Sequence, residues 1–339
     1  GWRRAVRWTP MLEGMTTGDP KQLSAILVEA LRGRTVASEA EERRKAAQRS
    51  FDEAKKALKD KKDEIKKCHL AREERTKAME TELKPLEEAL SQKRQEWLAA
   101  LKEAVPRPEL ALGKHLDCTG DEFRQCSKEF LECADHTDRE TLDLLATFGS
   151  DACIKEQSDR IEATPFCFIT GSGHQYFLDT VRELVGKVTP ERVYAALFEP
   201  WTYQEKTLSM RWDPVEDRRY ALMDRDPTAS DNEPRTVWMA NLLAYRGLVF
   251  FSSAPTSKGL GTTSWSHLNG ELSFTWPLWE AFLGPETIRT LLQAPALCSD
   301  KPDKSVLQAI GITTVFRARR IKVGEGANFK LNFSQAKAI

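Results

Sequence analysis

The sequence predicts an α+β fold: a mixed helical and antiparallel-strand body with a long inserted helical coiled-coil hairpin. Positions 34 to 112 contain no glycine, and most of this stretch is Glu, Lys, Arg, Ala and Leu, which is the composition of long helices. After it, amphipathic helical patterns give way to runs rich in β-branched and aromatic residues, which are typical of strands. At 339 residues the chain has room for a body and an insertion.

These patterns divide the chain into four predicted segments. Residues 1–37 form the N-terminal part of the body, 38–104 the coiled-coil hairpin, 105–300 a mixed α/β body and 301–339 a C-terminal basic β-hairpin. Because the sequence begins with Gly1 and not with Met, we expect the first segment to be incomplete. Charged residues make up 30% of the chain, which indicates one strongly solvated segment.

The charged segment carries apolar residues on two helical stripes. The stronger stripe follows four- and three-residue spacing: Met79, Leu83, Leu86, Leu90, Trp97 and Leu101. A weaker one contains Phe51, Ala54, Leu58, Ile65 and Cys68. Two antiparallel helices are the simplest solution, with the tip at 71–76 and Pro85 near the start of the second helix; one long kinked helix is the alternative. Mixed charge signs favour a solvated surface over a DNA-binding arm.

Helices and strands alternate in the predicted body. One helix carries Phe123, Cys126, Phe130 and Cys133, a second begins at the capping box 137–140, and a third begins after Thr189. A further helix begins at Arg235. Strands are predicted at 248–252, 272–275, 314–321 and 329–333, and the glycines at 324–326 would join the last two as a hairpin.

Composition excludes several classes of function. Lys plus Arg and Asp plus Glu both total 51, so any contact with nucleic acid must come from local basic patches. Seven cysteines without a CxxC pair predict neither a disulfide framework nor a zinc site, and they fit the reducing cytoplasm. No apolar run reaches the roughly 20 residues that cross a bilayer. With no HExxH or GxSxG motif, we expect no catalytic residue, no metal and no cofactor.

Two stretches have the chemistry of a nucleic-acid contact. The stretch 257–265 offers Lys258, the hydroxyls of Thr262 and Thr263, and glycines that let a strand come close, although an ordinary hairpin turn looks similar. The C-terminal hairpin carries five cations: Arg317, Arg319, Arg320, Lys322 and Lys330. Alternation puts Arg317 and Arg319 on one face, although edge strands also carry cations to prevent aggregation.

The stretch 208–220 mixes acids and arginines. Arg211, Arg218 and Arg219 lie beside Asp213, Glu216 and Asp217, so the charges either pair with one another, leave an arginine for a phosphate, or hold a metal. Farther along, Arg235 and Asn241 are polar candidates on an otherwise apolar helix. Asn can read a base edge, but a satisfied core Asn is commoner.

Four strings follow one another in a telling order: LSMRWDPVEDRRY at 208–220, RTVWMANLLAYRGL at 235–248, GLGTTSW at 259–265 and WPLW at 276–279. Together with the stretch 164–184, this series resembles the large subunit of type I CRISPR effector complexes (Cascade) of the U/G subtypes. The resemblance covers residues 164–292, and the coiled-coil insertion has no place in it.

The resemblance implies a non-catalytic subunit that contacts guide RNA and double-stranded target DNA. It would help recognise the protospacer-adjacent motif, bind other Cascade subunits and recruit the helicase-nuclease. The implied DNA contacts are the 258–263 loop with Arg211, Arg218, Arg219, Arg235 and Asn241. Two alternatives stay open: a coiled-coil scaffold that contacts only protein, and a metal-dependent nuclease that uses Asp213, Glu216 and Asp217.

Overall fold

The protein divides into two compact units. A computed structural model describes residues 2–4, 8–15, 17–68, 72–133, 139–156, 158–167, 176–212, 235–323 and 330–339. One unit is the insertion, residues 34–113, and the other is the body, residues 1–33 together with 114–339. The body contains both helices and antiparallel strands, so the predicted α+β class is confirmed. Residues 301–339 belong to the body and do not form a unit of their own.

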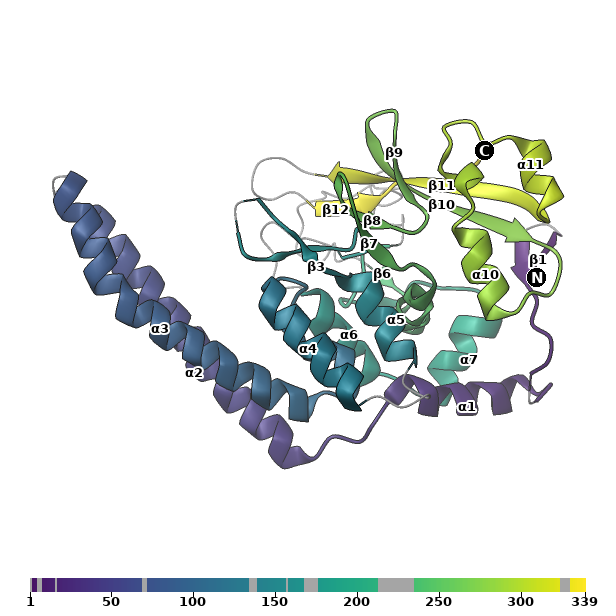
Figure 1. Cartoon of the computed structure of the whole chain (residues 1–339). Helices are drawn as coiled ribbons and strands as arrows, with labels where there is room; N and C mark the ends of the chain where they lie inside the picture. The colour runs from purple at the N-terminus through teal and green to yellow at the C-terminus, as the bar shows by residue number, and fades with distance from the viewer. Residues whose placement is uncertain are drawn as a thin grey trace, which may run out of the picture. The chain divides into compact units, whose positions relative to one another are not determined.

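The insertion consists of two long helices, α2 (Ser38–Lys67) and α3 (Arg72–Ala104), followed by the short 3-10 helix η1 (Pro108–Ala111). Ion pairs at both ends of the pair show an antiparallel arrangement: Arg43 meets Glu103 at 2.8 Å, and Lys61 meets Glu82 at 2.8 Å (Figure 1). Leu58, Ile65 and Leu83 form the apolar cluster between the helices. Supercoiling of the two helices stays a prediction.

An aromatic stack and a backbone clasp secure the base of the insertion. The rings of Phe51 and Trp97 are stacked with their centroids 5.3 Å apart, and Trp97 is 2% exposed. The backbone N–H of Arg34 donates to the Pro106 carbonyl at 2.9 Å, and its guanidinium donates to the Val105 carbonyl at 2.9 Å. The clasp therefore holds the chain just before α2 against the chain just after α3.

Two details of the predicted insertion were wrong. Residues 72–76, expected in the tip, form the first turns of α3, because Arg, Glu and Lys favour helix even without apolar periodicity. Pro85 lies in the interior of α3 and not near its start. The ring removes one backbone hydrogen bond there.

The body contains helices α1 (Pro20–Arg32), α4 (Gly120–Cys133), α5 (Arg139–Phe148), α6 (Phe177–Val185), α7 (Pro190–Phe198), α9 (Trp238–Gly247), α10 (Pro285–Leu292) and α11 (Lys304–Ala309). The short 3-10 helices are η2 (Leu248–Phe250) and η3 (Pro295–Cys298). Side chains cap several of these helices: the Thr189 hydroxyl accepts from the Arg192 N–H at the start of α7, as its sequence predicts.

The main sheet has the order β12-β11-β10-β9, with β13 also paired to β11. Its strands are β9 (Trp265–Leu268), β10 (Glu271–Trp279), β11 (Ile312–Val323), β12 (Lys330–Phe333) and β13 (Lys337–Ala338). Two-stranded pairs complete the body: β1 (Trp2–Arg4) with β2 (Trp8–Pro10), β3 (Gly149–Ile154) with β4 (Ile161–Ala163), β5 (Glu205–Lys206) with β6 (Arg235–Thr236), and β7 (Ser253–Thr256) with β8 (Gly259–Thr262). The long paired strands β10 and β11 are plain in Figure 1.

Aromatic rings hold the centre of the body. Phe148, Phe177 and Tyr245 are fully buried, and their ring centroids lie 6.3 to 6.4 Å apart. They come from three different helices, so their burial ties α5, α6 and α9 together. Full burial of each large aromatic side chain contributes about 2 to 3 kcal/mol.

The predicted strand 248–252 was wrong. Leu248 to Phe250 form η2 directly after α9, because a short apolar run looks alike in a strand and in a buried helical turn. The predicted helix start at Arg235 was also wrong: Arg235 lies in β6, where it pairs with Lys206. The strands predicted at 272–275 and 314–321 lie within β10 and β11, and β12 covers most of 329–333. The predicted turn at 324–326 lies outside the described residues.

Candidate nucleic-acid interface

The turn between β7 and β8 carries Lys258. The two strands pair with Thr256 opposite Gly259, so Ser257 and Lys258 form a two-residue turn. The Thr256 hydroxyl fixes this turn: it accepts from the Lys258 N–H at 3.2 Å and donates to the Gly259 carbonyl at 2.8 Å. The Lys258 side chain is exposed and makes no ion pair with a described residue. The fold therefore presents a cation at a rigid turn.

Glu162 on β4 supports this turn by a hydrogen bond to the strand that follows it. Its Oε2 accepts from the Leu260 N–H at 2.7 Å. Gly259 has φ +100°, and a Cβ placed on it would lie 2.7 Å from the same carboxylate oxygen. The backbone angle favours glycine at this position, and a Cβ would also push the Glu162 carboxylate away from the turn. The sequence analysis expected this glycine to let a nucleic-acid strand come close, but the group that lies next to it is the carboxylate of Glu162.

Arg320 on β11 points to the inner face of the main sheet. Successive strand residues point to opposite faces, and Arg320 shares its face with Ala318, which is 4% exposed. Its guanidinium lies over the Phe333 ring, 4.9 Å from the centroid, and Nη2 donates to the Cys167 carbonyl at 3.2 Å. No described carboxylate lies within ion-pair distance of it. Burial lowers the pKa of Arg320 to about 10, so the group is still charged at neutral pH.

These elements enclose one cavity of about 500 Å³, which we call the basic pocket. Its lining residues lie in or next to the strands β3, β4 and β7 to β12. Its charged lining residues are Lys155, Glu162, Lys258 and Arg320. Three cations against one carboxylate give this lining a net positive charge, with His267 beside them. Thr262, which is 7% exposed, also lines it, and its hydroxyl donates to Ser253 Oγ at 2.8 Å, because the Ser253 hydroxyl itself donates to the Thr147 carbonyl. The pocket thus unites Lys258, Thr262 and Arg320 from two separately predicted stretches.

Sequence reasoning did not single out several polar lining residues of the basic pocket, among them Lys155, Thr164 and Ser266. Lys155 follows β3, Thr164 follows β4, and Ser266 lies in β9. None of them lies in a stretch that the sequence analysis singled out as a contact, so no local pattern marked them as site residues. Cys167 also lines the pocket, and burial raises the pKa of its thiol to about 12, which makes it unreactive at neutral pH.

Thr263, Arg317 and Arg319 lie outside the lining and bind their own chain. The Thr263 hydroxyl donates to the Ser252 carbonyl at 3.0 Å. Arg317 and Arg319 share one face of β11, as alternation predicts, and this face is opposite to that of Arg320. Arg317 donates to the Thr275 hydroxyl at 3.0 Å and to two backbone carbonyls, at residues 299 and 300. Arg319 is exposed and pairs with Glu271 at 2.7 Å.

The remaining predicted contacts lie elsewhere in the body. Asn241 is 7% exposed, and its amide donates to the Thr236 hydroxyl at 2.6 Å, which is the commoner role of a core Asn. Arg211 is 4% exposed, and Arg235 is exposed on β6. Arg218 and Arg219 lie outside the described residues, as do the three acids of the alternative metal cluster. Of this set, the described residues Arg211, Arg235 and Asn241 do not line the basic pocket.

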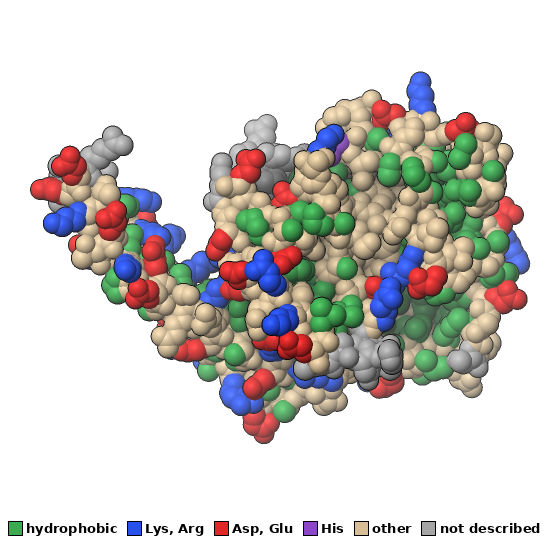
Figure 2. Space-filling view, viewed as in Figure 1, with side chains coloured by type: hydrophobic (Ala, Val, Ile, Leu, Met, Phe, Trp, Pro, Cys, Tyr) green, Lys and Arg blue, Asp and Glu red, His purple; other side chains and the backbone are tan. Residues whose placement is uncertain are grey.

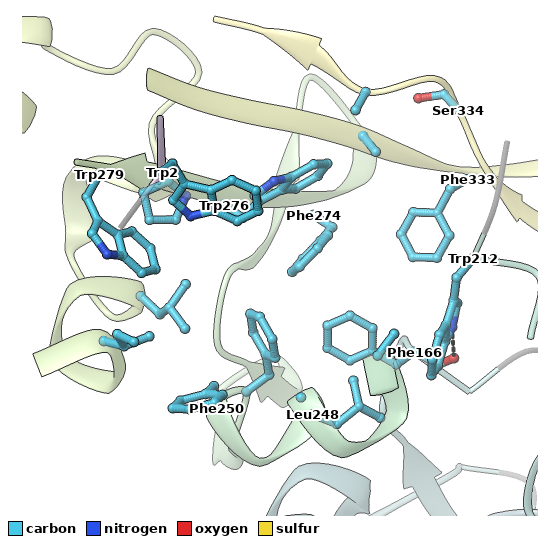
Figure 3. Close-up of a pocket in the computed structure, with 18 residues that line it drawn as sticks. Trp2, Phe166, Trp212, Leu248, Phe250, Phe274, Trp276, Trp279, Phe333 and Ser334 are labelled. Atoms are coloured by element: carbon cyan, nitrogen blue, oxygen red, sulfur yellow. Dashed lines mark hydrogen bonds between the residues drawn. The ribbon is translucent and has the colours of Figure 1, made fainter. Parts of the chain in front are cut away.

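A second cavity, of about 650 Å³, is lined almost entirely by apolar and aromatic side chains; we call it the aromatic pocket. Figure 3 shows Trp212, Phe274 and Phe333 around it, with the Trp212 indole donating to the Phe166 carbonyl at 2.9 Å. Among the described lining residues only Ser334 carries a hydroxyl, and that hydroxyl already bonds the backbone of Arg319. A nucleobase edge would find few partners here, so we do not assign this pocket to nucleic acid.

Charges are mixed on the insertion. Figure 2 shows acidic and basic side chains intermingled along the two helices, in agreement with the ion pairs that join them. Within the described ranges no cluster of three or more His, Cys, Asp or Glu side chains is arranged to hold a metal ion. None of the described helices is both long and apolar enough to cross a bilayer.

Comparison with known proteins gives no relative: no family model, no curated protein and no solved structure matches the chain.

Proposed function

We propose that this chain is a non-catalytic large subunit of a type I Cascade complex and that the basic pocket is one of its nucleic-acid contacts. The observation that supports the proposal is the convergence of Lys258, Thr262 and Arg320 on one cavity. Two of these residues come from the GLGTTSW stretch and its preceding lysine, and the third comes from a strand about sixty positions later. The two cations gathered in this manner suit phosphate oxygens.

The pocket suits a backbone contact better than a base contact. Lys and Arg grip phosphates whatever the sequence, and in RNA-guided complexes base pairing with the guide reads the target. In the proposal the subunit binds guide RNA and double-stranded target DNA in the cytoplasm, helps recognise the protospacer-adjacent motif and recruits the helicase-nuclease. The insertion would contact another Cascade subunit.

The scaffold alternative rests on the insertion. Its charged side chains are largely exposed, and ion pairs such as Lys62 with Glu87 at 3.0 Å use charges of both signs. Such a surface fits a protein partner with mixed charge better than a polyanion. The nuclease alternative depends on acids outside the described residues, and loss of interference in a folded Asp213→Ala protein would favour it.

The decisive test is to isolate the tagged chain from its native host and identify the proteins and RNA that copurify. Cas subunits together with repeat-derived small RNA are the expected result. A partner set without nucleic acid would refute the Cascade proposal and favour the scaffold. RNase treatment before elution separates partners held by RNA from those held by the insertion.

Replacing Lys258 by Ala tests the contact itself. We expect weaker target binding and a shallower dependence of the binding constant on salt, by about one unit of the logarithmic slope, because one phosphate contact is lost. Filter binding from low to moderate salt measures the slope. Lys301→Ala, an exposed lysine away from the pocket, is the matched control. An unchanged slope in the Lys258→Ala protein would remove the turn from the interface.

A further inference from the structure

The aromatic pocket is a second cavity, and a nucleic-acid contact does not explain it. Its volume of about 650 Å³ lies in the range of pockets that hold small molecules, roughly 300 to 1,000 Å³. Figure 3 shows Trp212, Phe250 and Phe274 on different sides of the space. All three side chains are only partly buried, so ring surface remains accessible in the lining. A ligand that stacks on these rings would cover it.

The rings around the aromatic pocket are held in place by contacts with one another. Phe166 meets Phe274 edge to face, with centroids 5.1 Å apart, and its centroid lies 5.3 Å from that of Phe251. Phe274 and Trp276 are stacked with centroids 5.1 Å apart. The Trp212 indole is fixed by its hydrogen bond to the Phe166 carbonyl at 2.9 Å. The walls are therefore formed before a ligand arrives, as is usual for small-molecule sites.

The lining of the aromatic pocket is uncharged. None of the described residues that line it is Asp, Glu, Lys, Arg or His. The Ser334 hydroxyl accepts from the Arg319 N–H at 2.9 Å and lies 3.3 Å from the Gln335 carbonyl, so it already has partners in the chain. A charged ligand would lose its water here without gaining a partner, which is a large cost that an apolar ligand does not incur. The lining thus selects a neutral, largely apolar molecule.

Two small residues of α9 leave an entrance to the cavity. Ala244 and Gly247 both line it and lie three positions apart, which places them on one side of the helix. Ala244 is exposed to solvent, and a Cβ built on Gly247 would have no heavy atom within 4 Å. A small molecule can therefore reach the rings beside these two residues.

We propose that the aromatic pocket binds a neutral, largely apolar small molecule that enters beside Ala244. An apolar cavity without a ligand destabilises a fold in proportion to its volume, and water in it finds few hydrogen-bond partners. A molecule that displaces this water and covers the rings stabilises the folded chain. The proposal goes beyond the nucleic-acid function and does not depend on it, because the aromatic pocket and the basic pocket have no described lining residue in common.

The test titrates the full chain with two dyes that share one ring system. Phenylnaphthylamine is neutral, and anilinonaphthalene sulfonate carries the same rings and one negative charge; both become fluorescent in apolar surroundings. We expect the neutral dye to saturate at one molecule per chain. Its Kd should be at least about tenfold lower than that of the sulfonate, because the charged group would have no partner in the lining.

Two variants block the pocket, and a third is their matched control. Gly247→Trp and Ala244→Trp place a large side chain at the entrance, and the φ of Gly247, −65°, suits any residue. Gly284→Trp makes the same change outside the lining, at a position with φ −74° where a Cβ also has no heavy atom within 4 Å. Circular dichroism shows whether each variant keeps its fold.

The Kd of the neutral dye should rise at least about tenfold in Gly247→Trp and Ala244→Trp and no more than about twofold in Gly284→Trp. The dye should also raise the Tm of the wild type and of Gly284→Trp, but not that of the two blocked variants. A wild-type chain that does not bind the neutral dye saturably would overturn the proposal, as would equal affinity for the sulfonate. Unchanged dye binding in both blocked variants would place the dye elsewhere and overturn it too. If a blocked variant fails to fold, the comparison of the two dyes on the wild type still decides.

Discussion

Arg320 should lower the stability of the folded protein, and its removal should raise it. The pKa of its guanidinium is lowered to about 10 because burial disfavours the charged form, with no described carboxylate to compensate. At about 1.4 kcal/mol for each pKa unit, the charge destabilises the fold by about 3 kcal/mol. Arg320→Met removes this term.

The substitution also removes two favourable contacts. The hydrogen bond to the Cys167 carbonyl, at 3.2 Å, contributes about 1 kcal/mol, and the stacking on Phe333 about as much. Met has a similar length and a sulfur that packs well on an aromatic ring. We therefore expect Arg320→Met to raise the free energy of unfolding by about 1 kcal/mol at neutral pH.

Urea unfolding followed by tryptophan fluorescence measures this change in the body, because eight of the nine tryptophans lie outside the insertion. At about 2 to 3 kcal/mol per molar urea, the midpoint should rise by about 0.4 M. Arg319→Met is the control and should leave the midpoint unchanged or slightly lower, since it loses an exposed ion pair. A fall of the midpoint in Arg320→Met would show that the guanidinium is a structural tie and would refute the reasoning.

The pH dependence supplies a second check on the same group. The folded protein releases the Arg320 proton near pH 10, whereas the unfolded chain retains it to higher pH. The unfolded state therefore binds more protons above pH 10, and the stability of wild type rises there relative to Arg320→Met. The difference in the free energy of unfolding between the two proteins should have its full value at pH 8 and should become smaller above pH 10.

Three further substitutions test other parts of the fold. Trp97→Ala should destabilise the insertion by about 3 to 5 kcal/mol, seen as lost helicity by circular dichroism, while the fluorescence transition of the body stays in place. Gly259→Ala should weaken nucleic-acid binding and stability more than Gly270→Ala, because both have positive φ but only Gly259 faces a carboxylate oxygen; equal effects would show that the close approach does not matter. Burial lowers the pKa of His115, whose Nδ1 accepts from the Phe177 N–H, so this contribution to stability is present above pH 6.5 and is lost as pH falls below it. In His115→Asn, the urea midpoint should change less between pH 7 and pH 5 than it does in the wild-type protein.

The sequence predicts helices and strands well in segments where one composition or one hydrophobic period dominates. The glycine-free charged stretch indicated a helical pair, and the aromatic and β-branched runs indicated β10 and β11. The residues 248–252 form a helical turn because a short apolar run fits a buried helix end as well as a strand. The tip was misplaced because polar residues that form good helices were interpreted as a turn.

The candidate site was also predictable only in part. Lys258 and Thr262 were accessible to prediction because a glycine-rich turn with a cation has recognisable chemistry. Arg320 was predicted as part of a surface patch, yet it lies on the inner face of the sheet, away from Arg317 and Arg319. Thr164 and Ser266 become significant only when distant strands bring them together, and no local pattern encodes that meeting.

The clasp at Arg34 has a consequence for how the insertion is carried. Its backbone bond to Pro106 makes the segment from Arg34 to Pro106, most of the insertion, begin and end at neighbouring points. An unstructured loop of that length would add about 2 to 3 kcal/mol of closure entropy compared with a loop of a few residues. Because these two points are joined, the insertion costs the body only the closure entropy of a short connection, whatever the length of its helices. Whole helical turns can therefore be gained or lost in matched pairs without altering the body, so the insertion can change its length independently of the site.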